Sequence, residues 1–310
     1  MSGSRVVAVV ATYRRAVELE RLLKSLEQSQ MPLHGIVVTD NATDPATAEA
    51  VNGTSIPHRL IQPGANLGCG GGLRRAEEAT AREFSDYTHI FILDDDAVVS
   101  PNTLPGLLDA CAAAKAGVAC PMIHDADQKM GWCPGLLNRR SHKALLRLGT
   151  PANYLAQIGP GLERFTWGTG VAMLVARETL ERAGLHREDF WIRGEDLDFS
   201  LRATWSPRGI FVPTVSVAHL PPGGGRVVNN FPERMKDAAM IQNCAYLVTR
   251  TRHGRSIAKF WPVNAWRHLQ RFGLRTMADV IRSAWLGGIR GLPAGVPEGD
   301  YFRQRLAKGK

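Results

Sequence analysis

Three consecutive carboxylates, Asp94, Asp95 and Asp96, follow a short apolar run of the sequence. Adjacent carboxylates repel one another unless a cation or solvent compensates for their charge. Mg²⁺ and Mn²⁺ bind carboxylate oxygens, and they also bridge diphosphates, where they neutralise the charge of a departing nucleotide. The triplet therefore predicts a divalent-cation site. A helix N-cap or a solvated turn before Pro101 is the alternative interpretation.

A second acidic cluster, formed by Glu195, Asp196 and Asp198, leads into a helical pattern at Ser200. A carboxylate at the start of a helix can act as a general base toward a hydroxyl group. Acidic side chains also favour the first turn of any helix, because they oppose the positive end of its dipole. Catalysis and helix capping both remain open for this cluster on the sequence alone.

A glycine-rich stretch runs from Asn66 to Gly72, and a helix is expected to begin near Leu73. Arg74 and Arg75 follow directly. Glycine allows close backbone approach to a ligand, and a helix start with neighbouring arginines suits anionic groups. A flexible turn is the alternative. The stretch lacks a GxGxxG arrangement after the first strand, which disfavours a nicotinamide or flavin site.

His219 ends an expected strand, in front of Pro221 and Pro222. A lone histidine is usually structural or exposed on the surface. In a chain that already offers an acidic metal site, a histidine at a strand end is a candidate additional ligand.

Strands alternate with helices along the first two thirds of the chain. Apolar β-branched runs predict strands, and apolar residues at helical spacing predict helices. The expected strands cover residues 5–11, 35–39, 89–93, 118–123, 171–176 and 212–218, and the expected helices cover 17–26, 103–116 and 177–183. This alternation predicts an α/β fold with a mainly parallel sheet flanked by helices.

Polar residues follow three of these strands where each one ends: Thr12, Asp40 and the triplet beginning at Asp94. In parallel sheets ligands bind outside the carboxyl ends of the strands, because the loops there converge. These residues are therefore expected to meet at one crevice.

The composition is that of a globular protein, with 44% hydrophobic and 22% charged residues among 310. The N-terminal residues are too few and too weakly charged for a signal peptide, and no stretch of about 18 uncharged apolar residues occurs. We therefore expect a cytoplasmic protein. The five cysteines form no CxxC spacing, which favours reduced thiols.

The net charge of +9 is unevenly distributed. Residues 250–310 hold 13 Lys and Arg against three acidic residues, whereas residues 1–249 carry a net charge of −1. Apolar and basic residues alternate at helical spacing in this basic segment. The apolar residues are Trp266, Leu269, Met277, Val280, Ile281 and Ala284, and the basic ones include Arg267, Arg271, Arg275 and Arg282.

A basic amphipathic segment suits an anionic membrane surface, and we expect residues 256–290 to dock there. A helix packed on the catalytic domain with a solvated basic face is the alternative. Nucleic-acid binding is not expected, because the basic residues lie outside any recognisable nucleic-acid module and the acidic clusters would repel phosphates.

The order of these motifs resembles inverting family 2 glycosyltransferases, especially the galactofuranosyl- and rhamnosyltransferase branch. The resemblance covers roughly residues 5–220. It rests on Val10-Ala11-Thr12-Tyr13, Asp40-Asn41, Asn66-Leu67-Gly68, Asp94-Asp95-Asp96, Gly194-Glu195-Asp196-Leu197-Asp198 and His219, in that order. It implies a GT-A type, Rossmann-like fold and a nucleoside-diphosphate sugar donor used with Mn²⁺ or Mg²⁺.

The resemblance also implies roles for single residues on the donor side. Thr12 would lie beside the nucleotide, Asp40 would accept from the imide NH of the base, and Asn66 with Gly68 would line the donor. Arg14, Arg75 and Asp95 complete the expected donor-binding set. Asp94 and Asp96 would form the metal-binding Asp-X-Asp pair together with His219, with Asp94 nearer the sugar and ribose.

On the acceptor side, Asp196 resembles the catalytic base of the family, with Glu195 beside it. Trp167 and Trp191 would form apolar walls for sugars. The sequence departs from the family at Asp40-Asn41-Ala42-Thr43, where Asp-Asp-Gly-Ser is common, and residues 128–161 match no assignable part.

These observations predict a GT-A catalytic domain over residues 1–225 and a helical, basic C-terminal extension over 226–310. The domain would have a nucleotide-sugar half at about 1–100 and an acceptor half at about 101–225. The predicted activity is inverting transfer from a sugar nucleotide, UDP-galactofuranose or dTDP-rhamnose, to a glycan or lipid-linked acceptor in cell-wall or polysaccharide synthesis. A nucleotidyltransferase that releases pyrophosphate and a non-catalytic binding module are the alternatives.

Overall fold

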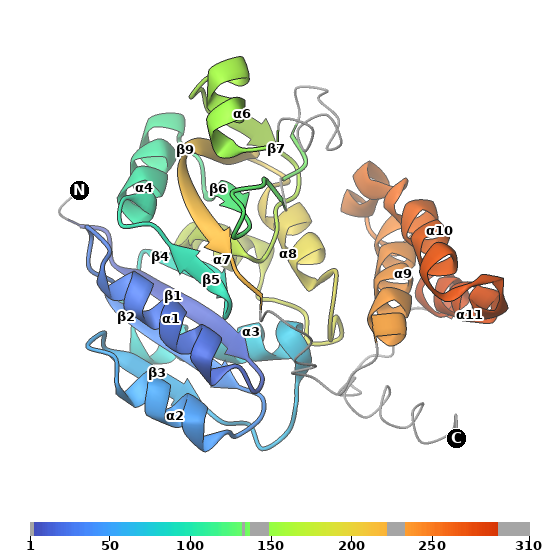
Figure 1. The fold of residues 1–310 in the computed structure, drawn as a ribbon, viewed down its shortest axis with the longest axis horizontal. Coiled ribbons are helices and arrows are strands. Elements are labelled where there is room, and N and C mark those ends of the chain that lie inside the picture. The colour runs from blue at the N-terminus through green and yellow to red at the C-terminus, as the bar shows by residue number, and fades with distance from the viewer. Residues whose placement is uncertain (1–2, 132–133, 137–148, 222–232, 291–310) are drawn as a thin grey trace.

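The computed structural model describes residues 3–131, 134–136, 149–221 and 233–290, and a nine-stranded mixed sheet forms its centre (Figure 1). The strands are β1 (Val6–Thr12), β2 (Gly35–Asp40), β3 (His58–Ile61), β4 (His89–Asp94), β5 (Ala97–Val99), β6 (Val118–His124), β7 (Glu163–Phe165), β8 (Ala172–Ala176) and β9 (Gly209–His219). Their order in the sheet is β3-β2-β1-β4-β8-β6-β9-β5, with β7 paired to β9.

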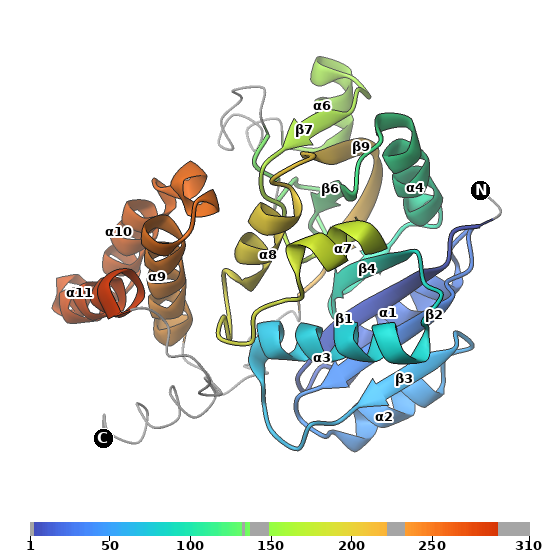
Figure 2. The ribbon, with the colours of Figure 1, turned by 180° about the vertical axis from the view of Figure 1, so that it is seen from behind.

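The helices that surround the sheet are α1 (Ala16–Glu27), α2 (Pro45–Asn52), α3 (Gly68–Glu83), α4 (Thr103–Ala114), α6 (Pro151–Ile158), α7 (Arg177–Ala183) and α8 (Glu195–Ala203). Helices α1, α2 and α4 cover one face of the sheet, and α3, α7 and α8 cover the other (Figures 1 and 2). The chain continues into α9 (Glu233–Arg250), α10 (Phe260–Phe272) and α11 (Met277–Trp285), which lie together beside α8. Two short 3₁₀ helices, η1 (His253–Ile257) and η2 (Leu274–Thr276), and a π-helix, η3 (Leu286–Arg290), accompany these helices.

The central strands are β-branched and buried, as expected for strands that are covered by helices on both faces. All six residues of β2 are buried, and in β1 only Ala11 is partly exposed. Strands β1, β2, β3 and β4 are parallel to one another, whereas β8 runs antiparallel to both β4 and β6. The predicted α/β fold with a mainly parallel sheet flanked by helices is confirmed.

The strand register brings the predicted strand-end residues to one edge of the sheet. Thr12 of β1 is paired with Asp40 of β2, and Ala11 is paired with Asp94 of β4. The loops that follow these three strands therefore begin side by side, as the sequence predicted.

Helix α3 begins at Gly68, so the prediction of a glycine loop before a helix near Leu73 is wrong. The glycines form the first turn of the helix, although glycine is a poor helix former. Close contacts between this turn and the loop before α8 account for the difference, as described below.

Residues 128–161, which the sequence left unassigned, contribute α6 and lead into β7. Helix α6 begins with Pro151 in its first turn, and the side chain of Thr150 accepts a hydrogen bond from the amide of Asn153 at 3.2 Å. Strand β7 then extends the sheet by pairing antiparallel to β9.

The expected single amphipathic segment is divided into two helices, because α10 ends at Gly273, which has a φ of +84°. Ile241, Ala265 and Val280 form a small apolar cluster that joins α9, α10 and α11. Val280 is thus buried and Leu269 packs against this cluster, whereas Trp266, Met277 and Ile281 are exposed. Part of the predicted apolar face therefore packs between the helices, and the rest is exposed to solvent.

None of the helices that the structure describes is both long and apolar enough to cross a bilayer. The predicted boundary between residues 225 and 226 lies outside the described residues, so the division into 1–225 and 226–310 stays a prediction.

Candidate functional site

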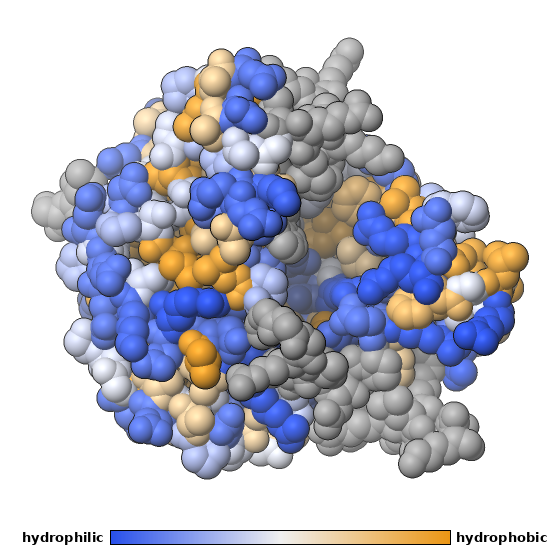
Figure 3. Space-filling model, in the orientation of Figure 1, coloured by the Kyte–Doolittle hydropathy of each residue, from blue (hydrophilic) through white to orange (hydrophobic). Residues whose placement is uncertain are grey.

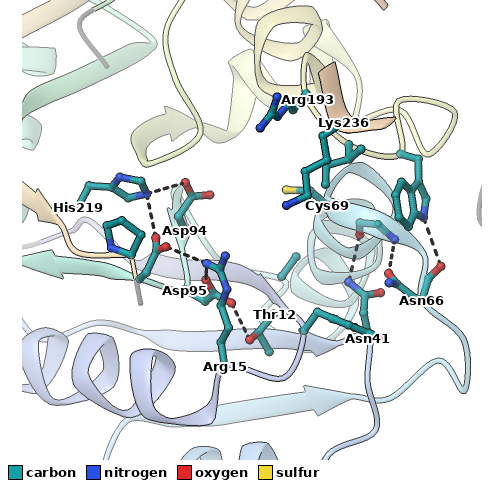
Figure 4. A pocket seen from close by; sticks show the side chains of 17 residues that line it. Thr12, Arg15, Asn41, Asn66, Cys69, Asp94, Asp95, Arg193, His219 and Lys236 are labelled. Carbon is teal, nitrogen blue, oxygen red and sulfur yellow. Dashed lines mark hydrogen bonds and ion pairs between the residues drawn. The ribbon is translucent and has the colours of Figure 1, made fainter. Parts of the chain in front are cut away.

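A cavity of about 380 Å³ opens at the carboxyl ends of β1 and β4. It is bounded by the acidic triplet on one side, by the start of α3 and the loop before α8 on another, and by α9 (Figure 4). Figure 3 shows the surface hollowed between the sheet domain and the C-terminal helices.

Asp94, Asp96 and His219 could together hold one metal ion. The Nε2 atom of His219 lies 2.9 Å from Oδ1 of Asp96 and 3.8 Å from Oδ2 of Asp94. One potential ligand atom from each of the three residues lies within 4.8 Å of the other two. Strand β9 brings the histidine there, because His219 pairs with Ala97, the residue directly after the triplet. Two carboxylates and an imidazole suit Mn²⁺ or Mg²⁺, so the residues present fit the implied ion.

The middle carboxylate, Asp95, has a different environment. Its Oδ2 atom accepts a hydrogen bond from Thr12 Oγ1 at 2.8 Å, and its Oδ1 atom accepts one from Arg15 Nη1 at 2.9 Å. The same Arg15 nitrogen lies 2.8 Å from Oδ2 of Asp96. Asp95 therefore ties the loop after β1 to the triplet, and Arg15 compensates for part of the acidic charge.

The protonation equilibria of the triplet reflect this crowding. Burial raises the pKa of Asp94 to about 7, and the charge of Asp96 adds to this effect. Burial raises the pKa of Asp95 to about 6, although Arg15 acts in the opposite direction. Burial also acts to raise the pKa of Asp96, but the hydrogen bond from His219 and its charge outweigh this and lower that pKa. The ionised form of two of the three carboxylates is thus destabilised, and a bound cation would stabilise it.

Asp196 lies close to this acidic site, in the first turn of α8. Its Oδ1 atom accepts from the amide of Leu197 at 2.7 Å and its Oδ2 atom from the amide of Gly170 at 3.2 Å. A Cβ atom on Gly170 would lie 3.3 Å from Asp196 Cβ and 3.9 Å from Asp94 Oδ1. Asp196 and Asp94 therefore lie on either side of Gly170, close to each other. Asp196 is not among the residues that line the cavity itself.

The neighbours of Asp196 in the acidic cluster have separate environments. Glu195 is buried next to Cys69, and burial together with the charge of Asp196 raises its pKa to about 8. Asp198 is buried and pairs with Arg202 one turn later, at 2.8 Å. Arg202 also donates to backbone carbonyls after α7, so Asp198 has a structural role.

The glycines of α3 allow two backbone segments to meet. A Cβ atom on Gly68, whose φ is +73°, would lie 2.1 Å from the carbonyl oxygen of Trp191. On Gly70 it would lie 2.5 Å from the carbonyl oxygens of both Arg187 and Phe190. Close backbone approach was predicted for this stretch, but the partner found is the loop before α8, and this contact places Trp191 in the wall of the cavity.

Comparison with known proteins identifies the family. The Glycosyl transferase family 2 domain matches residues 7–169, which is more than half of the chain. The chain belongs to this glycosyltransferase family. The predicted resemblance to inverting family 2 enzymes is confirmed at the level of the family, and the chain is a glycosyltransferase.

Two mycobacterial proteins are similar over much of the chain. An N-acetylglucosaminyl-diphospho-decaprenol L-rhamnosyltransferase of Mycobacterium tuberculosis (strain H37Rv) is 27% identical over 236 residues, which cover 69% of this chain and 76% of that protein. Galactofuranosyltransferase GlfT1 of Mycolicibacterium smegmatis is 26% identical over 299 residues, which cover 91% of this chain and 96% of that protein. Both belong to the branch that the sequence motifs indicated.

Among solved structures, the mannosyltransferase PcManGT from Pyrobaculum calidifontis, in complex with GDP-Man and Mn²⁺, superposes with a TM-score of 0.52. The alignment covers 98% of this chain and 80% of that one at 17% identity, which supports a shared GT-A fold.

The structure of this glycosyltransferase brings together most of the residues that the sequence singled out. Those that line the cavity are Thr12, Asn66, Gly68, Asp94, Asp95, Asp96, Trp191 and His219. These residues come from five separate parts of the chain, which the register of the sheet and the contacts of α3 bring together.

Besides Glu195 and Asp196, four predicted residues do not line the cavity. Arg14 is exposed above the ring of Tyr13, and Arg75 is exposed on α3, where it pairs with Glu78 at 2.9 Å. The buried carboxylate of Asp40 accepts from the amides of Ala42 and Asp44, so it holds its own loop and does not line the cavity. Trp167 packs edge-on against Phe260, with ring centroids 5.1 Å apart, and its predicted role as an acceptor wall has no support in the cavity lining.

Several residues that line the cavity were not predicted, among them Arg15, Asn41, Cys69, Arg193 and Lys236. Arg15 and Asn41 directly follow predicted residues, so the strand-end signal found the correct loops but the wrong side chains. Asn41 links its loop to α3, donating to Gly68 O at 3.1 Å and accepting from the amide of Leu67 at 3.0 Å. No local signal pointed to Lys236, because it lies on α9, in the segment predicted to be an extension.

Proposed function

We propose that this glycosyltransferase is metal-dependent and inverting, and that it transfers a sugar from a nucleoside diphosphate to a hydroxyl group of a lipid-linked acceptor. The carrying observation is the convergence of Asp94, Asp96 and His219 at the strand ends, with Asp196 close by. The solved mannosyltransferase, which contains GDP-Man and Mn²⁺, supports the donor class and the metal. The name of the M. tuberculosis relative, with its diphospho-decaprenol acceptor, supports the acceptor class.

Asp94, Asp96 and His219 would hold the ion. When bound, Mn²⁺ or Mg²⁺ supplies positive charge to the diphosphate that leaves with the nucleotide. The hydrogen bonds of Asp95 to Thr12 and Arg15 orient the loop after β1 toward this diphosphate. Asn66, Gly68 and Trp191 form the wall along which the donor lies.

Asp196 is the proposed general base. Its carboxylate takes the proton of the acceptor hydroxyl as the acceptor oxygen forms a bond to the anomeric carbon of the donor sugar. The bond between that carbon and the diphosphate oxygen breaks on the opposite face, which inverts the anomeric configuration and releases a nucleoside diphosphate. The amides of Leu197 and Gly170 orient the carboxylate by their hydrogen bonds.

The two mycobacterial relatives support dTDP-rhamnose or UDP-galactofuranose as the donor. Calorimetric titration of UDP, GDP and dTDP sugars in the presence of Mn²⁺ tests this choice. Product analysis then tests the reaction: release of a nucleoside diphosphate with formation of a glycoside supports the proposal. Release of pyrophosphate would instead favour the nucleotidyltransferase alternative, which family membership already disfavours.

We also propose that this enzyme contacts an anionic membrane through the outer side of α10 and α11. Exposed apolar side chains on and between these helices are Val263, Trp266, Leu274, Met277, Ile281 and Trp285, and apolar surface is visible at the outer end of the C-terminal helices (Figure 3). Exposed arginines lie among them. Apolar area and cationic charge together suit an anionic lipid surface, where a lipid-linked acceptor resides.

A further inference from the structure

Two cations of the cavity wall have no part in the chemistry proposed above. Arg193 and Lys236 both line the cavity and lie across it from the acidic triplet (Figure 4). Arg193 precedes α8, which carries the proposed base, and Lys236 belongs to the first turn of α9.

The backbone holds Arg193 in an uncommon conformation. Its φ is +58°, a left-handed value that is unfavourable for a residue with a side chain, and Gly194 follows with a φ of +99°. Asn243 of α9 donates a hydrogen bond from Nδ2 to the carbonyl oxygen of Arg193 at 2.7 Å. Helix α9 thus fixes the turn that directs this arginine.

The acidic residues of α9 hold these cations in place but do not outnumber them. Lys236 Nζ lies 2.7 Å from Glu233 Oε1, and Arg193 contacts Glu233 at 2.7 Å and also pairs with Asp237. Arg271 of α10 adds a third cation, at 3.0 Å from Asp237. Three cations therefore share two carboxylates.

Lys236 is largely shielded from solvent, with 14% of its side chain exposed, and Arg193 is partly shielded, with 34% exposed. A cation beside a cavity and away from bulk water favours an anionic ligand. Since Arg193 and Lys236 line the wall formed by α9 and the loop before α8, the anion is expected on that side of the cavity.

We infer that Arg193 and Lys236 bind a phosphate group of a substrate, an inference that rests on the proposed function. The guanidinium group can donate two hydrogen bonds to phosphate oxygens, and the ammonium group adds a point charge. The phosphate belongs either to the diphosphate of the nucleotide sugar or to the diphosphate of a lipid-linked acceptor. Both sources present the same chemistry to this wall.

Calorimetric titration distinguishes the two sources, with UDP and farnesyl diphosphate as probes and Mn²⁺ present in both cases. Lys236→Gln and Arg193→Gln are each expected to lower the affinity of the protein for one of these diphosphates by about 10- to 100-fold. This is the range for losing a charge-assisted hydrogen bond. Loss of UDP affinity assigns the pair to the donor, and loss of farnesyl diphosphate affinity assigns it to the acceptor. Lys236→Arg, which keeps the charge, is expected to retain binding.

Arg271→Gln is the matched control, because Arg271 pairs with the same acids but does not line the cavity. Its affinities for both probes should stay near those of the wild type, and farnesol, which lacks phosphate, should show no difference between variants. Unchanged affinity for both diphosphates in Lys236→Gln and Arg193→Gln overturns the inference. An equal loss in Arg271→Gln, or no binding of either probe to the wild type, overturns it as well.

The outcome is separable from that of the proposed function. A protein that binds a diphosphate through these two residues but transfers no sugar would refute the proposed activity and leave the phosphate-binding pair in place. If the wild type transfers sugar and both variants keep its affinity for the two diphosphates, the proposed activity stands and the phosphate-binding pair is refuted.

Discussion

Carboxylates of the same type have different environments in this enzyme, and their neighbours decide their roles. Asp95 and Asp198 are each held by an arginine, at 2.9 Å and 2.8 Å respectively. Asp94 and Asp96 both face the imidazole of His219, and Asp96 also contacts Arg15 at 2.8 Å. Asp196 is oriented by two backbone amides.

Asp96→Asn is expected to lower the rate of sugar transfer by more than about 100-fold, because the variant loses a charged ligand of the proposed ion. Removing a direct ligand should cost more than removing a residue that only hydrogen-bonds to a ligand. Steady-state turnover with titrated Mn²⁺ measures this effect, and excess EDTA should abolish activity of the wild type. Asp127→Asn, at an exposed site, is the control. Full activity in EDTA would show that the triplet does not act through a metal.

Asp196→Asn is expected to lower turnover by roughly two to four orders of magnitude, the range for loss of a general base, while donor affinity changes little. Glu195→Gln is the matched variant, since it changes the adjacent buried carboxyl. If Glu195→Gln lost the activity and Asp196→Asn kept it, Glu195 would be the base.

The pH profile gives an independent test of the same carboxylate. Burial raises the pKa of Asp196 above the 3.8 of an unperturbed aspartate, and its backbone hydrogen bonds only partly oppose this. A base acts in its deprotonated form, so kcat/KM should fall as pH decreases through this raised pKa. Measurement at saturating Mn²⁺ should place the acidic midpoint above 3.8. A wild-type profile that stays flat down to that pH would contradict the assignment.

At the level of secondary-structure elements, the contact of α3 with the loop before α8 determines the shape of one cavity wall. The amide of Cys69 donates to the carbonyl oxygen of Trp191 at 2.8 Å, and the first turn of α3 has no room for side chains at Gly68 and Gly70. Helix propensity alone would favour alanine at the latter position. The glycine is therefore explained by packing between elements.

Gly70→Ala is expected to lower the free energy of unfolding by about 1–3 kcal/mol, because its Cβ would overlap two backbone carbonyl oxygens. Donor affinity should fall as well, since Trp191 belongs to the displaced loop. Thermal unfolding and donor titration measure the two effects. Gly161→Ala, where nothing lies within 4 Å of the added Cβ, should leave both unchanged. Equal stability of the two variants would refute the packing argument.

At the scale of the whole molecule, a nearly neutral sheet domain is joined to a strongly basic C-terminal part. Helix α9 contacts both, because it contributes Lys236 to the cavity and packs against α10 and α11. The inner side of α10 and α11 packs on α9, and membrane docking stays a proposal for their outer side.

Vesicles that contain anionic lipid are expected to bind the protein through the outer side of α10 and α11. Each basic residue near such a surface contributes about 1 kcal/mol. Arg267, Arg275 and Arg282 changed to Glu should abolish co-sedimentation, and this set leaves Arg271 and its ion pairs intact. Trp266→Ser with Ile281→Ser should weaken binding by removing exposed apolar area.

Binding should also decrease with salt, because the Debye length falls from about 10 Å at 0.1 M to about 3 Å at 1 M. Vesicles of neutral lipid are the control. Absence of binding at low salt, or unchanged binding of the arginine variant, would end the membrane proposal and leave the catalytic assignment untouched.

Local patterns of the sequence determined which segments become strands and where polar residues leave them. The buried β-branched runs predicted β1, β2 and β4 to within a residue or two, and the triplet at Asp94 was located at the end of its strand. Such features depend on neighbouring residues and on burial periodicity, which the linear sequence contains. The ordered motifs were sufficient to identify the family.

Only the tertiary structure decided which side chain of each loop faces the cavity. In the folded protein Arg15 points toward the triplet and Arg14 points away from it. The carboxylate of Asp40 accepts hydrogen bonds from its own loop, and the α3 glycines leave space for the loop before α8. The tertiary structure also brought Lys236 to the cavity from a distant helix. These outcomes depend on contacts between residues far apart in the chain, and packing establishes such contacts without any repeat or spacing that the sequence could display.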